Sequence, residues 1–460
     1  MMKKFIAILL TICTLALATA CEHANTTINN NTTPNVHTQS TPTDNTSTNS
    51  IDDDILEWDV NEFTIVGEDG DNIPKMQYND MKMDSQGNVY IAYITSEETF
   101  SLAKKGENGF SVLASGAVSE RTLDIGLITE TEEEKDKLYL PEPVNIMFDS
   151  HDVPYVMGYL NECMVVYKYD ENAKALVQVS KHELSYKEGE EVYSHKNLQE
   201  NFTVDEHFNA YFTVLHAPLI KTEIYIQPDY SRYVLEVIKY DVENNQFTSC
   251  FFDDVKNYCK LICTSEDGIV YICGSKIFPN GSVESAMELH TFEFLDNGSV
   301  IHKNVQTLAY SDVSDISAGA INMWLDENNN IYVYYNYNEN FGMKTSKYIA
   351  IISNGEIIDT KPINKYLVDS KKRPIARPSR DWFYSEDGQL YFFEICNDKR
   401  NDIYIGKRDF STGEITKLRE ILLPEKYMPY VFDIISDGNG GYHIAYLLES
   451  YKGICYFHLN

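Results

Sequence analysis

The sequence predicts an all-β protein whose globular part is a single β-propeller of seven four-stranded blades. Three observations lead to this prediction. A tyrosine recurs seven times at intervals of 51 to 65 residues, an aspartate or serine stands six residues before each tyrosine, and no helical periodicity of useful length interrupts the repeats. Long repeats built only from strands and turns are typical of propeller blades rather than of solenoid turns.

Each repeat begins with a segment typical of a β-hairpin, because Gly, Asn and Asp separate two apolar runs just before the tyrosine. The tyrosines are Tyr90, Tyr155, Tyr211, Tyr271, Tyr332, Tyr391 and Tyr442, and the residues six positions earlier are Asp84, Asp149, Asp205, Ser265, Asp326, Ser385 and Ser436. A second hairpin follows in most repeats, as at 165–179, 237–250, 348–360 and 403–418. Two hairpins per repeat predict a blade of four strands.

The last repeat lacks one strand, since the chain stops after three apolar runs at 431–436, 442–447 and 453–459. Residues 62–66 precede the first repeat and are expected to supply the missing strand. Such pairing would close the ring and remove its open sheet edge. The alternative is eight blades, with a degenerate blade between Asp84 and Asp149, where the interval is longest.

Turn sequences such as DSQGNVY at 84–90 resemble the D-x-x-G-N-x-Y hairpins of NHL-type and two-component-regulator-type propellers. The resemblance covers about 400 residues and implies the fold alone. The repeats are longer than typical NHL repeats, and neither a WD dipeptide nor an S-x-D-x-G-x-T-W motif is present. No functional residue is therefore carried over from these families.

The first 20 residues have the composition of an export signal, with Lys3 and Lys4, an apolar run at 5–17, and small residues before Cys21. The apolar run is shorter than the roughly 20 residues of a transmembrane helix. The segment resembles the bacterial lipobox, although Leu17 stands one place earlier than usual. This resemblance implies removal of residues 1–20, acylation of Cys21 with palmitate-type chains, and anchoring to membrane lipid outside the cytoplasm. Simple secretion is the alternative.

Residues 21–50 are expected to form a disordered tether after the acylated cysteine, and residues 51–460 the propeller. Of residues 22–50, 19 of 29 are Asn, Thr or Ser, so little apolar surface is available to offset the entropy of ordering.

The mature chain is strongly acidic. The full sequence holds 70 acidic and 38 basic residues, and loss of Lys3 and Lys4 leaves a formal charge of −34. Such a charge repels polyanions, so no nucleic-acid partner is expected. The chain is expected to be a monomer. Seven cysteines follow Cys21, an odd number with no disulfide framework, and most are expected to be buried and reduced.

One candidate ligand site is a polar ring at the mouth of the propeller channel. The positions ten residues before the tyrosines hold Asn or Asp in five of seven repeats, namely Asp80, Asn145, Asn201, Asn322 and Asp381. Their oxygens suit a hard cation such as Ca²⁺ or the hydroxyls of a sugar. The alternative is that each side chain caps backbone groups of its own strand.

A second candidate site is the basic segment 361–380, which holds seven basic residues and one acid. Expected between the fifth and sixth blades, it would present Lys371, Lys372, Arg373, Arg377 and Arg380, with Trp382 just beyond. These cations suit an acidic polymer or a carboxylated sugar. A solvated loop that balances nearby acids is the alternative.

No catalytic motif of a metalloprotease, a serine hydrolase or a cysteine enzyme occurs in the chain. The leading hypothesis is therefore a surface-anchored, non-catalytic binding lipoprotein for a glycan or another wall-associated molecule. The alternatives are an extracellular polysaccharide hydrolase or lyase that uses carboxylates at the channel mouth, and a protein-interaction scaffold.

Overall fold

In the computed structural model, the repeated aspartate stabilises the hairpin turn between the first two strands of a repeat by accepting hydrogen bonds within that turn. The Asp84 side chain accepts hydrogen bonds from the backbone amides of Gln86 and Asn88, at 3.0 and 2.8 Å, and from the Tyr90 hydroxyl at 3.3 Å. The same set of bonds is made by Asp205 and Asp326. In these three repeats the spacing of aspartate and tyrosine is explained by a hydrogen bond between their side chains.

The structure describes residues 55–57, 64–66, most of 77–362, and the strand segments 382–386, 389–396, 402–408, 415–422, 432–437, 442–447 and 454–459. Within 77–362 the description leaves out 97–98, 108, 119, 122–125, 128–139, 142–143, 161–162, 185–191, 197–201, 222–224, 266, 279–283, 314–315, 327 and 340–343. Contacts divide the chain after Asp52, and everything below concerns the second unit, Asp53–Asn460.

The third residue after the aspartate or serine has a positive φ in five repeats. The residues are Gly87, Asp152, Phe208, Gly268 and Asn329, with φ between 59° and 82°. Glycine adopts this conformation without a Cβ penalty, and Asn and Asp tolerate it better than most residues. Phe208 has no such tolerance, but its ring packs against a buried apolar cluster.

Four antiparallel sheets of four strands follow the chain in order, each joined by hairpins. The first has β3 Gln77–Met83, β4 Val89–Ser96, β5 Thr99–Gly106 and β6 Gly109–Ala117. The second has β10 Asn145–Phe148, β11 Pro154–Leu160, β12 Cys163–Asp170 and β13 Ala175–Glu183. A later sheet has β20 Asn257–Thr264, β21 Ile269–Lys276, β22 Ser285–Phe294 and β23 Val300–Ser311. The sheet after it has β24 Ser317–Leu325, β25 Ile331–Glu339, β26 Lys344–Ser353 and β27 Glu356–Pro362.

Two sheets carry additional strands. The sheet between β13 and β20 is built on β16 Asn209–Lys221, β18 Val234–Asp241 and β19 Gln246–Phe252. Two short strands, β14 Val192–Lys196 and β15 Phe202–Val204, pair with successive parts of β16 on its inner side. β17 Tyr225–Pro228 and β8 Gly126–Leu127 extend this sheet, and a 3-10 turn, Tyr230–Arg232, precedes β18. The other sheet has β28 Trp382–Glu386, β29 Gln389–Cys396, β30 Asp402–Arg408, β31 Ile415–Leu422 and β1 Ile55–Glu57.

The fifth sheet of four strands joins segments from both ends of the unit. It has the order β2 Thr64–Val66, β34 Ile454–Leu459, β33 Tyr442–Leu447 and β32 Phe432–Ser436. The three C-terminal strands match the predicted runs to within one residue. Between β6 and β10, the described residues form only the two-residue strands β7 Glu120–Arg121, β8 and β9 Leu140–Pro141.

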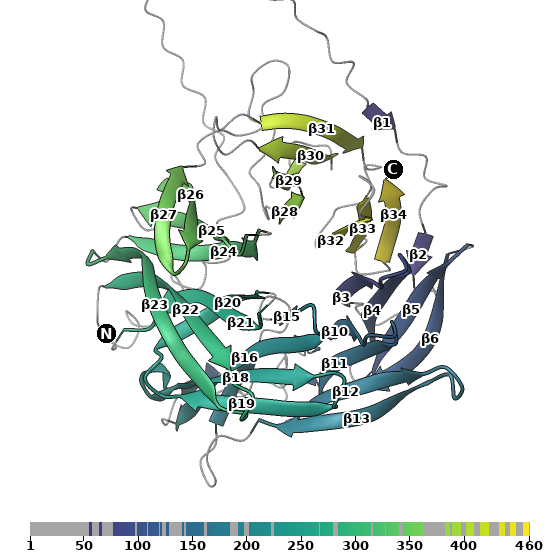
Figure 1. Cartoon of the computed structure of the whole chain (residues 1–460), viewed down its shortest axis with the longest axis horizontal. Coiled ribbons are helices and arrows are strands. Elements are labelled where there is room, and N and C mark those ends of the chain that lie inside the picture. The colour runs from purple at the N-terminus through teal and green to yellow at the C-terminus, as the bar shows by residue number, and fades with distance from the viewer. Residues whose placement is uncertain are drawn as a thin grey trace, which may run out of the picture. The chain divides into compact units, whose positions relative to one another are not determined.

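Successive sheets meet along their inner strands, as in a β-propeller (Figure 1). β3 contacts β10 of the second sheet and β32 of the last, while β15 contacts β20, β20 contacts β24, and β24 contacts β28. The prediction of an all-β, repeat-built propeller is confirmed at this level.

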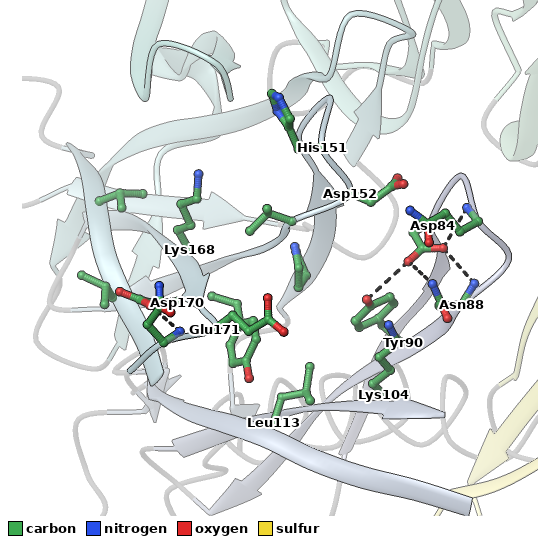
Figure 2. Close-up of a pocket in the computed structure, with 17 residues that line it drawn as sticks. Asp84, Asn88, Tyr90, Lys104, Leu113, His151, Asp152, Lys168, Asp170 and Glu171 are labelled. Carbon is green, nitrogen blue, oxygen red and sulfur yellow. Dashed lines mark hydrogen bonds between the residues drawn. The ribbon is translucent and has the colours of Figure 1, made fainter. Parts of the chain in front are cut away.

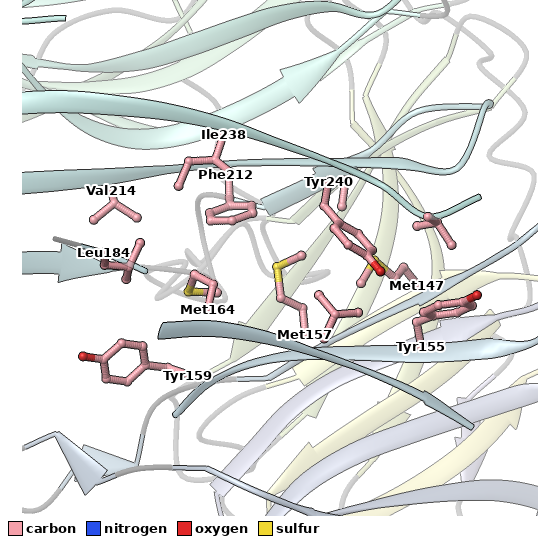
Figure 3. Packing of buried hydrophobic residues seen from close by; sticks show 13 residues of the cluster. Met147, Tyr155, Met157, Tyr159, Met164, Leu184, Phe212, Val214, Ile238 and Tyr240 are labelled. Carbon is pink, nitrogen blue, oxygen red and sulfur yellow. The ribbon is translucent and has the colours of Figure 1, made fainter. Parts of the chain in front are cut away.

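Apolar side chains fill the space between sheets on both faces of each strand. On β11, Tyr155 and Met157 belong to one buried cluster with Phe212, Ile238 and Tyr240 of the next sheet (Figure 3). The intervening Val156 belongs to the cluster shared with the first sheet. Because β11 is covered on both faces, it lacks the apolar–polar alternation of half-exposed strands, whereas the outer strands β13 and β27 keep exposed positions.

The inner strands β3, β20 and β24 share an irregularity that the sequence did not reveal. In each, the register to the next strand shifts around the residue eleven positions before the repeated tyrosine. The extra residue is typical of a β-bulge, which re-aims the side chains beside it. Asp80 and Asn322 directly follow two of these bulges.

Candidate functional site

Asp80, predicted to lie at a channel mouth, links two sheets. It lies on β3 and is 4% exposed. Its carboxylate accepts a hydrogen bond from the backbone amide of Ile146 on β10, at 2.7 Å, and lies 3.1 Å from the ammonium of Lys82. One carboxylate oxygen of Asp80, a residue predicted to bind an external ligand, therefore holds neighbouring inner strands together.

The other described members of the predicted ring are dispersed over different sheets. Asn145 lies buried on β10, next to the amide that Asp80 binds. Asn322 lies on β24, and its Oδ1 accepts a hydrogen bond from the amide of Met323, at 2.8 Å. This local bond agrees with the alternative reading of the ring, in which each side chain caps backbone groups of its own strand. Asn201 and Asp381 lie outside the described residues.

Apart from Lys361 and Pro362, which end β27, the basic segment also lies outside the described residues, as do Cys21 and the signal. This applies to Lys371, Lys372, Arg373, Arg377 and Arg380. Trp382 begins β28 and pairs with Phe393 on β29, but its side chain is not described. The expectations for these residues remain predictions.

A groove of about 720 Å³ lies between the first two sheets, on the side of their hairpin turns (Figure 2). The first sheet contributes Lys104 and the turn around Asp84, and the second contributes His151, Lys168 and the β12–β13 turn. Leu113, Val177 and Val179 form an apolar part of the lining. A concave site that combines apolar surface with a few polar groups is typical of ligand binding.

The lysines of the groove belong to a cross-strand pattern that accompanies the repeated tyrosine. Lys104 stands opposite Tyr90, and Lys168 stands opposite Tyr155. Each Nζ lies over the ring of its tyrosine, 5.0 and 4.9 Å from the centroid. A lysine also faces the tyrosine in two later sheets, as Lys239 and Lys407. Cation–π contact thus holds the ammonium groups of Lys104 and Lys168 near their turns, and Nζ of Lys239 lies 5.9 Å from the ring centroid of Tyr211.

The two groove lysines differ in their electrostatic partners. Lys168 lies 3.2 Å from the carboxylate of Asp149, and its hydrogen bonds to Tyr155 and to Asp149 raise the pKa of its ammonium. For Lys104, no carboxylate lies within ion-pair distance in the described part of the chain. Lys104 is therefore a half-buried cation that contacts the side chain of Tyr90 and interacts with Asp152 only through charge at longer range.

Carboxylates join the hairpin turns of neighbouring sheets beside the groove. Asp152 of the second sheet accepts hydrogen bonds from the amide and the hydroxyl of Ser85 of the first, at 3.0 and 2.6 Å. These bonds lower the pKa of the Asp152 carboxyl. In the same manner, Glu243 of the following sheet accepts from the amide of Ser150, at 3.0 Å. The turns that border the groove are therefore held relative to one another.

A second polar cluster crosses the next sheet and joins it to β13. Buried Glu236 on β18 accepts hydrogen bonds from Nε2 of His182 and Nε2 of His216, both at 2.8 Å. Nδ1 of His216 is hydrogen-bonded to the hydroxyl of Ser194, 2.9 Å away. Burial raises the pKa of Glu236, but the two histidines outweigh burial and lower it to about 2.

Sequence reasoning missed both of these arrangements. The four residues of the Glu236 cluster come from four strands and have no spacing that resembles a motif. Glu236 and His216 are fully buried, and neither lines the groove. Of the residues that the structure describes, none form a group of three or more His, Cys, Asp or Glu that could hold a metal ion. No described helix is long and apolar enough to span a membrane.

Comparison with known proteins identifies no family for this chain. The sequence matches no family model and no curated protein. Among solved structures, it is similar to a Bacteroides fragilis protein provisionally described as a 6-phosphogluconolactonase, with 12% identity, a TM-score of 0.40, and coverage of 75% of this chain and 84% of that one.

Two further similarities concern proteins of different kinds. Sqt1 from Saccharomyces cerevisiae has 8% identity and a TM-score of 0.38, over 87% of this chain and 99% of its own. An oligogalacturonate lyase in complex with manganese has 8% identity and a TM-score of 0.42, over 84% and 97%. At these scores the similarities carry no argument about activity, and the fold rests on the sheets themselves.

Proposed function

We propose that the chain is a lipid-anchored, extracytoplasmic binding protein that holds a glycan or another wall-associated molecule in the groove between its first two sheets. It acts as a monomer without a catalytic step, and nucleic acid is not a partner. The observation that carries the proposal is the groove, whose lining combines Leu113 and Val177 with the ammonium of Lys104 and the acids of the β12–β13 turn.

The propeller in this proposal has seven blades. The pairing of Thr64–Val66 with Tyr456–Ile454 supports closure by an N-terminal strand. The described residues between β6 and β10 form two-residue strands rather than a four-stranded sheet, which favours seven blades over eight. Deletion of residues 51–66 from the mature chain is expected to lower its stability, and unchanged urea unfolding would argue against closure by this segment.

The anchor in this proposal is the acylated Cys21. Cells that express the chain and take up labelled palmitate are expected to yield a labelled protein in the membrane fraction. The variant Cys21→Ala is expected to lose both the label and the membrane association. Equal labelling of the two proteins would rule out acylation at Cys21.

Binding is tested with the purified mature chain against glycans and wall polymers. Val177→Trp fills the groove at an exposed position on β13, and Ile358→Trp is a matched control on β27 of another sheet. We expect Val177→Trp to weaken binding at least tenfold while the control binds normally. Equal binding by both variants would place the site elsewhere, and release of new reducing ends would indicate an enzyme.

A further inference from the structure

The groove contains two charged side chains on opposite sides that form no ion pair in the described part of the chain. Lys104 comes from β5 of the first sheet, and Glu171 from the turn between β12 and β13 of the second (Figure 2). Within the described part of the chain, Glu171 has no hydrogen bond or ion pair, and Lys104 has no carboxylate within 4.0 Å.

The remaining charged groups of the groove are already used by the protein. Asp84 and Asp170 accept backbone amides of their own turns, and Asp152 binds Ser85. Lys168 is paired with Asp149. A ligand therefore meets one available cation and one available anion.

We propose that the groove binds the amino-acid part of a wall-associated molecule, with the ligand carboxylate at Lys104 and the ligand ammonium at Glu171. This inference rests on the proposed function and names its ligand class. Charge-assisted hydrogen bonds to both groups would orient such a ligand between the two sheets.

The net charge of the protein favours this ligand over an acidic polymer. A chain with a formal charge of −32 in full, or −34 without its signal, repels polyanions, whereas a zwitterion has no net charge and is not repelled. A neutral sugar would leave Lys104 and Glu171 without a countercharge. The apolar side chains Leu113 and Val179 offer contact for a small aliphatic side chain of the ligand.

The experiment measures binding of three alanine dipeptides to the purified mature chain by saturation-transfer NMR and calorimetry. The probes are Ala-Ala, N-acetyl-Ala-Ala, which lacks the ammonium, and Ala-Ala-amide, which lacks the carboxylate. Each blocked probe is expected to bind on the order of tenfold more weakly than Ala-Ala, the loss typical of one charge-assisted hydrogen bond.

Two variants assign each ligand charge to a protein residue. In Lys104→Gln, the difference between Ala-Ala and its amide is expected to disappear while the effect of acetylation remains. In Glu171→Gln, the effect of acetylation is expected to disappear while that of amidation remains. Glu107→Gln, an exposed change outside the lining, should leave both differences intact. Each effect is the ratio of the affinities of two probes for the same variant. A small loss of folded protein lowers the binding of both probes alike and therefore does not change this ratio.

The outcomes separate this inference from the proposed function. Binding of glycans in a manner that Val177→Trp prevents, without binding of Ala-Ala, would overturn the inference and leave the proposed function standing. Binding of Ala-Ala that does not depend on either charge would also overturn it. Absence of binding by dipeptides, glycans and wall polymers would overturn both.

Discussion

The carboxylate of Asp80 on β3 accepts a hydrogen bond from the backbone amide of Ile146 on β10, at 2.7 Å. Both residues are buried, so the bond joins the inner strands of two sheets where water does not compete. Asp80 therefore has a structural partner at the position where the sequence suggested an external ligand.

Removal of this carboxylate is expected to destabilise the protein. Asp80→Ala leaves the Ile146 amide buried without its acceptor, which should lower the free energy of unfolding by about 1–3 kcal/mol. Urea unfolding measures the change. Asn322→Ala is the matched control from the same predicted ring, and it should change stability by less than about 1 kcal/mol because its described bond is local. An Asp80→Ala protein as stable as the control would contradict the structural role.

The Glu236 cluster predicts a pH dependence of stability. The folded-state pKa is about 2, below the ordinary 4.5, so the stabilisation is fully present above pH 4.5 and is lost as the pH falls toward 2. That shift corresponds to about 3 kcal/mol. Urea midpoints between pH 2 and pH 6 should therefore fall more steeply with acidification in the wild type than in Glu236→Gln. Parallel curves would show that Glu236 does not titrate in this way.

Gly87 provides a direct test of the left-handed turn position. Its φ is +82°, and a Cβ at this position would meet no atom within 4 Å. Gly87→Ala should therefore cost about 1–2 kcal/mol through backbone conformation alone. Gly319→Ala is the matched control, because space is open there too and the glycine does not have a positive φ. Equal unfolding midpoints for the two variants would argue against strain at the turn.

The buried thiols are expected to resist alkylation in the folded protein. Cys259, Cys263 and Cys273 are each at most 8% exposed, and burial raises all three pKa values, that of Cys259 to about 12. The reactive thiolate is therefore scarce at pH 8. Peptide mapping after a short iodoacetamide treatment should find these residues unmodified in the native state and modified in urea. Rapid native modification would indicate that the sheet of β20 and β21, which holds all three cysteines, opens locally.

The repeat and its hairpins could be predicted because their determinants are close together in the sequence. The bonds of Asp84 to Gln86, Asn88 and Tyr90 span at most six residues, and the turn conformation follows from them. The three C-terminal strands could be placed for the same reason. Phe208 was not foreseen at a positive φ, because its packing rather than its own preference holds it there.

The groove and the buried cluster could not be predicted, because both depend on which strands become neighbours. Lys104 and Glu171 meet the same cavity only after the first two sheets have packed. His182 reaches Glu236 from a different sheet. The opposite error occurred at Asp80, where the sequence suggested a polar group at a strand entrance, whereas Asp80 lies within β3 and its partner is on β10.

The two carboxylate links between hairpin turns have the same direction along the chain. In each, the earlier sheet donates through a serine, Ser85 or Ser150, and the later sheet accepts through Asp152 or Glu243. The second sheet therefore lies in the middle of a series of joints, since it accepts from the sheet before it through Asp152 and donates to the sheet after it through Ser150. A movement of this sheet would strain both joints at once.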